Sequence, residues 1–205
     1  MAAIIGRKLG MTQIFDEAGA VVPVTVIEAE PCTVTQVKNV EQDGYAALQL
    51  GWGRKKDARG SKAEKGHAAK AGLDYAPRRL REFPLAADAS VEVGQQLGVD
   101  QFADGDTVIV TGTTKGRGFQ GVVKRHGFTG RPGSHGHPRS RNPGTLGPGT
   151  NPSRVIKGKK LPGHMGAARQ TLRSVRVVRV DADRNLLFVR GPVPGARNSV
   201  VFIRK

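Results

Sequence analysis

The chain has 205 residues, of which 38% are hydrophobic and only 5% aromatic, and it carries a formal net charge of +16. With 28 Gly and 12 Pro, it has the composition of one modest core accompanied by a good deal of irregular chain. The positive charge predicts a polyanionic partner, and the most apolar run without charge, residues 18–27, is too short to span a membrane.

The single cysteine, Cys32, excludes an intrachain disulfide and makes a reducing cytosol the expected setting. It lies in a run of alternating apolar residues, so we expect a small buried thiol rather than a reactive one. The first residues lack the long apolar region of a signal peptide. The expected location is therefore the cytoplasm.

The first 50 residues have the pattern of short β-strands separated by turns. Residues 11–15 and 21–29 flank Asp16-Glu17-Ala18-Gly19, a hairpin-like connection. Residues 33–40 and 45–50 flank a second turn signal. Short β-branched runs at such regular spacing are typical of an antiparallel sheet or a small barrel.

Residues 54–98 differ in composition, and we expect them to form an inserted segment of mixed and helical structure beside the barrel. The Ala- and Lys-rich residues 63–71 predict a short helix that ends at Gly72. Residues 78–83 are too short a run for an element to be assigned.

Strand patterns return at residues 107–112, 172–180 and 186–190, the last two separated by a plausible hairpin turn. Because the sheet resumes there, residues 116–166 are expected to leave the body as a long loop. A loop of about 50 residues without regular structure is uncommon inside a compact domain unless a partner orders it.

The acidic residues are distributed very unevenly along the chain. None of the 17 Asp and Glu lies between Asp106 and Asp181, whereas that span carries 15 of the 33 Lys and Arg. The rest of the chain holds 18 cations and all 17 acids. A solvated face would usually mix both signs, and strand-like sequence on both sides argues against a disordered tail. The sequence therefore predicts a nearly neutral β body bearing a basic loop.

Gly116-Arg117-Gly118-Phe119-Gln120-Gly121 matches the G-x-G-x-x-G pattern of dinucleotide-binding folds. That fold needs alternating strands and helices and an acidic residue about 20 positions further on. Neither is present, since the next acid is Asp181. Glycines beside Lys115 and Arg117 would also let the backbone approach an RNA phosphate closely.

Lys157-Gly158-Lys159-Lys160 resembles the end of a P-loop. However, Ser153 stands where the motif begins with Gly, and Lys160 replaces the Ser or Thr whose hydroxyl binds magnesium. We therefore reject a P-loop.

Four histidines in the basic segment, His126, His135, His137 and His164, raise the question of a metal site. Structural zinc needs four ligands, usually including Cys, and the segment offers neither a Cys nor a carboxylate. The Ser before His135 likewise lacks an acid that could orient the His for catalysis. We expect no metal, no cofactor and no enzymatic activity, and assign these histidines to contacts with phosphates or bases.

Gly and Pro recur through residues 131–160 and oppose regular structure, while cations recur every few positions. Phe119 and Phe128 are the aromatic residues available for stacking, so a single-strand platform of the aromatic kind is not expected. The predicted chemistry is phosphate neutralisation and shape fitting, with little base readout.

Several long stretches of the chain resemble ribosomal protein L three (L3) of the bacterial large subunit, and the resemblance extends from about residue 4 to about residue 203. The stretches are IGRKLGMTQIF at 5–15, PVTVIEA at 23–29, PCTVTQV at 31–37, TKGRGFQGVVKRH at 114–126, RVIKGKKLPGHMG at 154–166 and NLLFVRGPVPG at 185–195.

This resemblance implies a mainly β fold, with a small antiparallel β-barrel of the translation-factor type, an inserted α/loop segment and a long irregular basic extension. The residue patterns above give the expected division: barrel strands at 1–53, the insertion at 54–98, a barrel strand at 99–115, the extension at 116–166 and the last barrel strands at 167–205. It also implies a structural constituent of the large ribosomal subunit that binds the large-subunit rRNA early in assembly. The extension would run inward toward the peptidyl-transferase region.

The expected partners are large-subunit rRNA and neighbouring large-subunit ribosomal proteins, with no membrane and no small-molecule substrate. The residues expected to bind rRNA are Lys115, Arg117, Lys124, Arg125, His126, Arg131, His135, His137, Arg139, Arg141, Arg154, Lys157, Lys159, Lys160, His164 and Arg169. The alternative from the same charge pattern is an architectural protein for DNA or free RNA.

One position departs from the family pattern. Some bacterial members carry an N-methylated Gln in the stretch that corresponds to residues 147–152, and aligning on Pro152 places Thr150 there. A hydroxyl cannot receive an amide methylation, so that modification is not expected in this chain.

Overall fold

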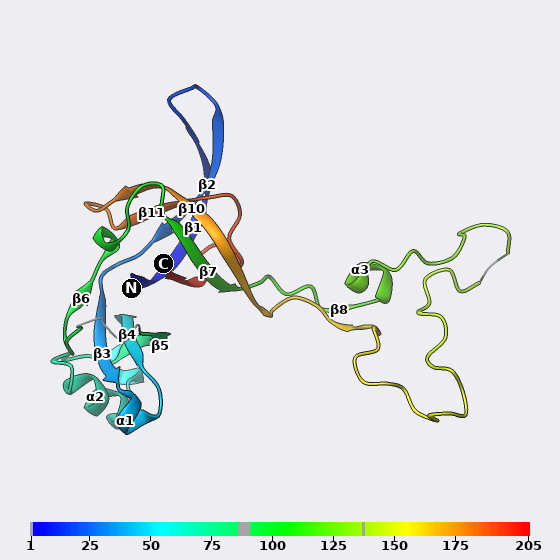
Figure 1. Cartoon of the computed structure of the whole chain (residues 1–205), viewed down its shortest axis with the longest axis horizontal. Coiled ribbons are helices and arrows are strands. Elements are labelled where there is room, and N and C mark those ends of the chain that lie inside the picture. Colours follow the sequence, from blue (N-terminus) through cyan, green and yellow to red (C-terminus); the bar gives the residue numbers. More distant parts are fainter. Residues whose placement is uncertain (1, 86–90, 137) are drawn as a thin grey trace. The chain divides into compact units, whose positions relative to one another are not determined.

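The structure is a computed structural model that describes residues 2–85, 91–136 and 138–205. The chain divides into two compact units. Unit 1 comprises Met1–Thr113 and Arg169–Lys205, and unit 2 comprises Thr114–Ala168 (Figure 1). Unit 2 is thus inserted into unit 1 between two of its strands.

Unit 1 holds most of the regular structure. Its strands are β1 (Ala3–Phe15), β2 (Val21–Glu28), β3 (Cys32–Lys38), β4 (Ala47–Arg54), β5 (Pro77–Pro84), β6 (Gln96–Leu97), β7 (Thr107–Thr113), β10 (Arg169–Asp181), β11 (Leu186–Arg190) and β12 (Val200–Arg204). Its helices are α1 (Val40–Asp43), η1 (Asp57–Arg59), α2 (Lys62–Ala69) and η2 (Val99–Gln101). Unit 2 contains β8 (Phe119–Gln120), α3 (Val122–His126) and β9 (Gly163–His164).

Six strands of unit 1 close into an antiparallel barrel in the order β1-β12-β7-β10-β11-β2. Alternate residues of each strand point into the barrel. Val108 and Val110 in β7 and Val201 and Ile203 in β12 are accordingly fully buried. Closure pairs both edges of the sheet and leaves it without a free edge.

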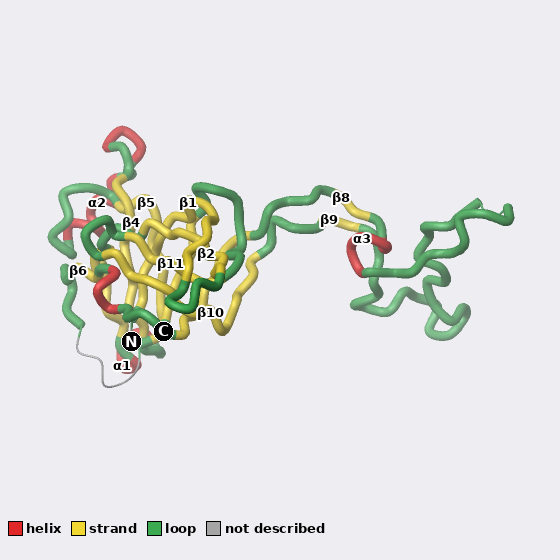
Figure 2. Tube along the Cα trace, turned by 90° about the horizontal axis from the view of Figure 1, so that it is seen from above, coloured by secondary structure: helices red, strands yellow, loops and turns green. Residues whose placement is uncertain are grey.

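A second antiparallel sheet has the order β5-β4-β3-β6 and lies within the same unit (Figure 2). Its buried residues Leu50, Trp52 and Phe83 belong to one hydrophobic cluster with Ile4 and Ile203 of the barrel. The barrel and the sheet therefore share a continuous core.

The first four residues of β1 are all buried, and Ala3, Ile4 and Ile5 belong to the hydrophobic cluster that the barrel shares with the second sheet. A Cβ added at Gly6 would lie 2.6 Å from Cγ2 of Ile27, so any side chain there would force its neighbours to shift. The backbone N–H of Ile5 donates to Sγ of Cys32 at 3.4 Å, and the thiol is fully buried. Burial raises the pKa of the Cys32 thiol to about 12, in agreement with the expected inert thiol.

Most of the predicted strands are confirmed. The patterns at 21–29, 107–112, 172–180 and 186–190 correspond to β2, β7, β10 and β11. The expected helix at 63–71 is α2, which begins with a capping box between Ser61 and Glu64.

Two expectations differ from the structure. Residues 1–53 were expected to supply barrel strands only, but β3 and β4 form the second sheet with β5 and β6 from the 54–98 segment. The alternation of apolar residues is the same in both settings, so the pattern cannot tell which sheet a strand joins. The strand expected at 33–40 ends at Lys38, because Val40 begins α1.

Candidate nucleic-acid interface

Unit 2 holds positive charge without any compensating acid. Its residues include eleven Lys and Arg, four of the five His, and no Asp or Glu. Unit 1 holds the other 22 cations together with all 17 acids. A segment with no internal counter-charge requires an external one, such as a polyanion.

Unit 2 begins and ends as a narrow two-stranded ribbon. Thr114 N–H donates to the carbonyl of Ala168 at 2.9 Å, and Arg117 N–H donates to that of Met165 at 2.9 Å. Phe119 then pairs with His164, and Gln120 with Gly163, as β8 and β9 (Figure 2). These contacts bring the segments that carry Lys115, Arg117 and His164 side by side.

A second set of contacts forms around α3, in which Val122 is the buried residue. Gly127 ends the helix in the left-handed conformation, with a φ of 72°. Arg125 Nη1 donates to the carbonyl of Leu161 at 2.7 Å, and His126 Nε2 lies 3.1 Å from the same oxygen. Arg125 and His126 therefore hold the returning chain, in addition to any role toward RNA.

The middle of unit 2 contains a chain reversal that gathers two further cations. Arg131 N–H donates to the carbonyl of Ser140 at 2.8 Å. An open hollow of about 420 Å³ follows, lined by Arg131, Arg139, Asn142 and neighbouring small residues. Because two guanidinium groups line this hollow, it suits the phosphate backbone of a nucleic acid better than an apolar ligand.

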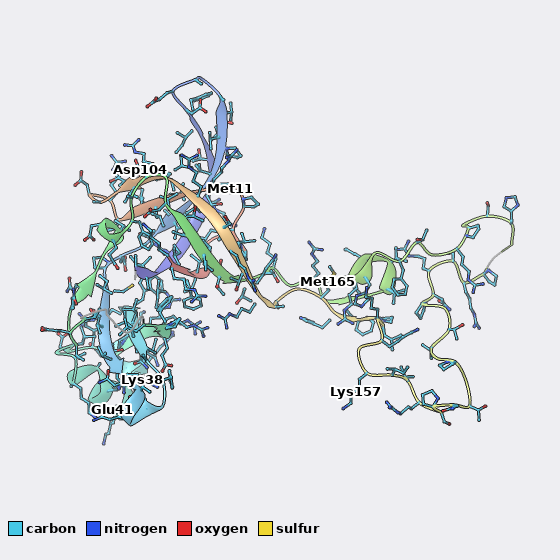
Figure 3. The ribbon with its side chains drawn as sticks, in the orientation of Figure 1. Met11, Lys38, Glu41, Asp104, Lys157 and Met165 are labelled. Carbon is cyan, nitrogen blue, oxygen red and sulfur yellow. The ribbon has the colours of Figure 1, made fainter. Side chains whose placement is uncertain are left out.

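The residues predicted to bind rRNA differ in their surroundings. Most of these residues are exposed, among them Lys157, whose side chain extends away from the chain (Figure 3). Arg125 and His126 are half-buried, Arg169 belongs to β10 of unit 1, and His137 lies outside the described residues. The exposed ones are Lys115, Arg117, Lys124, Arg131, His135, Arg139, Arg141, Arg154, Lys157, Lys159, Lys160, His164 and Arg169.

The sequence prediction did not include two arginines of unit 1 that meet Arg169. Arg81 in β5 and Arg204 in β12 line one hollow with it. Arg81 and Arg204 lie outside the acid-free stretch at 107–180, which includes Arg169, so the signal that marked the other residues does not reveal them. The signal that remains is the register of the barrel strands, which only the fold supplies.

The chain is similar to one family of known proteins over nearly its whole length. A sequence model of the family described as Ribosomal protein L3 matches residues 81–185. The chain is 54% identical over 201 residues to the large ribosomal subunit protein uL3 of Oceanobacillus iheyensis, covering 98% of this chain and 95% of that protein. The uL3 proteins of Halalkalibacterium halodurans and Trichlorobacter lovleyi are 52% and 50% identical over 98% of this chain and 95% of their own.

The chain belongs to the ribosomal protein L3 family. The stretch matched by the L3 model runs from β5 into the β10–β11 turn and contains the whole of unit 2. The L3 resemblance inferred from the sequence motifs is therefore confirmed.

Other site chemistry receives no support from the described part of the chain. No group of three or more His, Cys, Asp and Glu suited to a metal ion occurs among the residues that the structure describes. The G-x-G-x-x-G stretch lies in the ribbon and ends at Gly121, the N-cap of α3, and its strand β8 pairs antiparallel with β9 rather than in the parallel pairing of a dinucleotide-binding fold. In the described ranges, no helix has the length and apolar character needed to cross a membrane.

Proposed function

We propose that this chain is a structural, non-enzymatic constituent of the large ribosomal subunit that binds large-subunit rRNA directly. The relatives are named large ribosomal subunit protein uL3, and they match nearly the whole chain. The chain acts in cytoplasmic ribosomes, where the family's members bind rRNA early in assembly.

The observation that carries the proposal is the charge of unit 2, with eleven cations and no acid. Lys and Arg contacts to phosphates release condensed counterions, which makes such binding strong at low salt. If each of these cations met one phosphate, the log–log slope of affinity against salt would be roughly 8 to 10.

The two units have different tasks. Unit 1 buries a continuous hydrophobic core and folds by its own packing. Unit 2 buries little apolar surface, with Val122 as a fully buried side chain and Phe119, Val155 and Ile156 exposed. RNA that surrounds unit 2 neutralises its cations and orders the extension, whose course toward the peptidyl-transferase region is part of this proposal.

Sedimentation at high salt tests the proposal. A tagged copy expressed in cells should co-sediment with large subunits after a high-salt wash, because a buried extension is not released by screening alone. Release of the whole population into the free fraction would contradict it and favour a loose binder of DNA or free RNA.

A further inference from the structure

The outer face of the barrel carries a row of three side chains across neighbouring strands. Strand β7 pairs with β12 on one side and with β10 on the other, and its residue Thr111 is directly opposite Phe202 of β12 and Thr171 of β10. Directly opposed residues point to the same face of a sheet. The hydroxyls of Thr111 and Thr171 are 3.0 Å apart, so one of them donates to the other.

Strand β5 of the second sheet borders this row and converts it into a hollow. The guanidinium carbon of Arg81 lies 5.2 Å from the centroid of the Phe202 ring, a cation–π arrangement that keeps the Arg81 head group beside this row. The hollow has a volume of about 190 Å³, and Arg169 and Arg204 also line it.

The charge of this hollow is almost entirely positive. Its one carboxylate, Glu82, pairs with Lys38 at 3.0 Å and accepts a hydrogen bond from the Tyr45 hydroxyl at 2.9 Å. Glu82 is therefore already compensated. Among the described residues, no carboxylate forms an ion pair with the three arginines.

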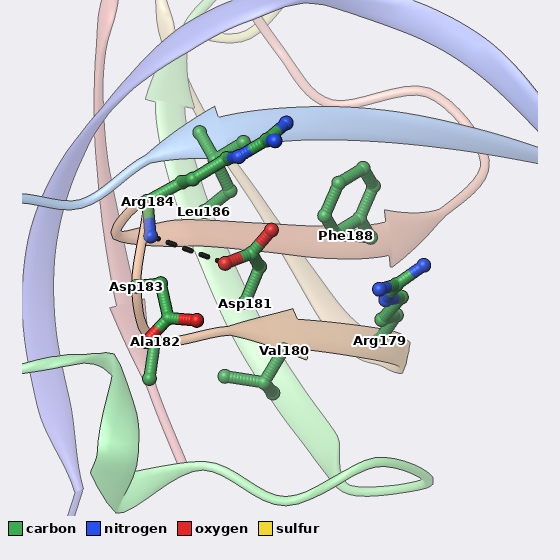
Figure 4. A pocket seen from close by; sticks show the side chains of 8 residues that line it. All are labelled: Arg179, Val180, Asp181, Ala182, Asp183, Arg184, Leu186 and Phe188. Carbon is green, nitrogen blue, oxygen red and sulfur yellow. Dashed lines mark hydrogen bonds between the residues drawn. The ribbon is translucent and has the colours of Figure 1, made fainter.

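Another hollow of unit 1 shows what a mixed charge looks like. At the β10–β11 turn, Arg179 and Arg184 stand beside Asp181 and Asp183 (Figure 4). Asp181 accepts from the backbone N–H of Arg184 at 3.1 Å. Two acids offset two cations there, so that hollow does not select a polyanion.

We propose that Arg81, Arg169 and Arg204 form a phosphate-binding site on the barrel that takes the backbone of the rRNA. Guanidinium groups match phosphate oxygens in a two-point geometry, and the Thr171 hydroxyl adds a donor when it accepts from the Thr111 hydroxyl. The hollow has room for a phosphate group. The inference rests on the proposed function, because it assigns the phosphates to rRNA.

The site gives unit 1 its own contact with RNA, in addition to those of unit 2. Arginines carried by strands of the barrel and of the second sheet suit positioning on the RNA surface, since phosphate contacts set register and orientation without reading sequence.

The test is the salt dependence of binding between the full chain and a large-subunit rRNA transcript. A variant with Arg81→Gln, Arg169→Gln and Arg204→Gln should lower the log–log slope by roughly 2, since each lost phosphate contact removes about 0.7 to 0.9. The matched control replaces three exposed arginines elsewhere on unit 1, Arg59, Arg173 and Arg184, by Gln and should lower the slope by less than about 1.

A second variant protects the test against unfolding. Arg169→Gln with Arg204→Gln leaves Arg81 on Phe202 and should lower the slope by roughly 1.5 while keeping a cooperative melt. If this double variant keeps the parent's slope, the site is not a phosphate contact and the inference is wrong.

Two further outcomes are distinguishable. If the parent chain binds the transcript without a steep salt dependence, the proposed function itself is overturned. If the parent's affinity depends steeply on salt and the variants have the same slope, only this site is overturned. Inorganic phosphate at constant ionic strength should shift the melting temperature of parent and triple variant equally. A parent-specific shift with an unchanged RNA slope would instead identify a site for free phosphate.

Discussion

Thr113 of β7 lies directly opposite Arg169 of β10, so the two residues that border unit 2 are partners in one antiparallel ladder. The next residues continue this pairing, since Thr114 N–H donates to the carbonyl of Ala168 at 2.9 Å. The ends of the insertion are thus held together by the barrel sheet itself.

This pairing predicts that much of unit 2 is dispensable for folding. Replacing residues 128–157 by a short Gly/Ser link should leave a β-rich circular dichroism spectrum and a cooperative melt. Loop closure depends weakly on length, with about 0.6 kcal/mol for each doubling. The same variant should yield misassembled or slow subunits, because the inner RNA lacks its cations. A truncated chain without a cooperative melt would show that the extension is part of the core.

A second prediction compares two glycines of β1. A Cβ at Gly6 would lie 2.6 Å from Cγ2 of Ile27 and 2.9 Å from the carbonyl oxygen of Glu28, whereas one at Gly10 meets only Nε of Arg197 at 3.8 Å. Gly6→Ala should therefore cost about 1–3 kcal/mol in free energy of unfolding. Gly10→Ala is the control and should change it by less than about 1 kcal/mol. Urea unfolding measures both, and equal midpoints would refute the close packing at Gly6.

A third prediction concerns the ribbon of unit 2. Gly166 has a φ of +74°, and its added Cβ would overlap the carbonyl oxygen of Lys115, whereas Gly121 has open space around it. Gly166→Ala should open the ribbon and speed trypsin cleavage after Lys115 and Arg117. Gly121→Ala should be cleaved at the parent's rate. Cleavage of the Gly166 variant no faster than the control would mean that the ribbon tolerates the side chain.

How far the sequence leads depends on the kind of signal. Strand β11 is predicted with its observed bounds, because its apolar run begins after the polar turn at 181–185 and stops before Gly191 and Pro192. The acid-free segment is visible as composition alone. The sequence prediction began the first strand at residue 11, whereas β1 begins at Ala3. Residues 3–10 contain Gly6 and Gly10, and glycines weaken a strand pattern.

Other features depend on pairing between distant segments, which no local pattern reports. The meeting of Arg81, Arg169 and Arg204 requires the register of β12 and β10 against β7. The roles of Arg125 and His126 likewise need the carbonyl of Leu161, some 35 residues away. The sequence prediction assigned Arg125 and His126 to RNA contacts alone, like the other basic residues of the segment.

A fourth prediction follows from the ion pairs of unit 1. Hydrogen bonds from Lys38 and Tyr45 hold the pKa of Glu82 below its usual range, as Lys55 does for Glu64. A lowered carboxyl pKa stabilises the fold above the unfolded pKa of about 4.3 and loses that contribution as pH falls through the folded pKa. Glu82→Gln should therefore lower the melting temperature at neutral pH.

The pH profile separates this charge effect from a packing effect. The difference in melting temperature between parent and Glu82→Gln should shrink as the pH falls from about 5 toward 2. Glu17→Gln, at the exposed β1–β2 turn, is the matched control and should change the profile little. A Glu82 difference that stays constant over this range would contradict the assigned role of the Lys38 pair.

The most direct test of the central claim is the salt slope of rRNA binding when the basic stretch at 154–160 is neutralised. Its four cations, Arg154, Lys157, Lys159 and Lys160, are exposed in a segment without acids. The control changes four exposed cations of unit 1, Lys56, Arg59, Lys62 and Lys70, to Gln. Replacing the four of unit 2 by Gln should lower the log–log slope by about 3, and the control by no more than about 1. Equal slopes for the parent and the unit 2 variant would contradict the claim that this segment neutralises RNA phosphates.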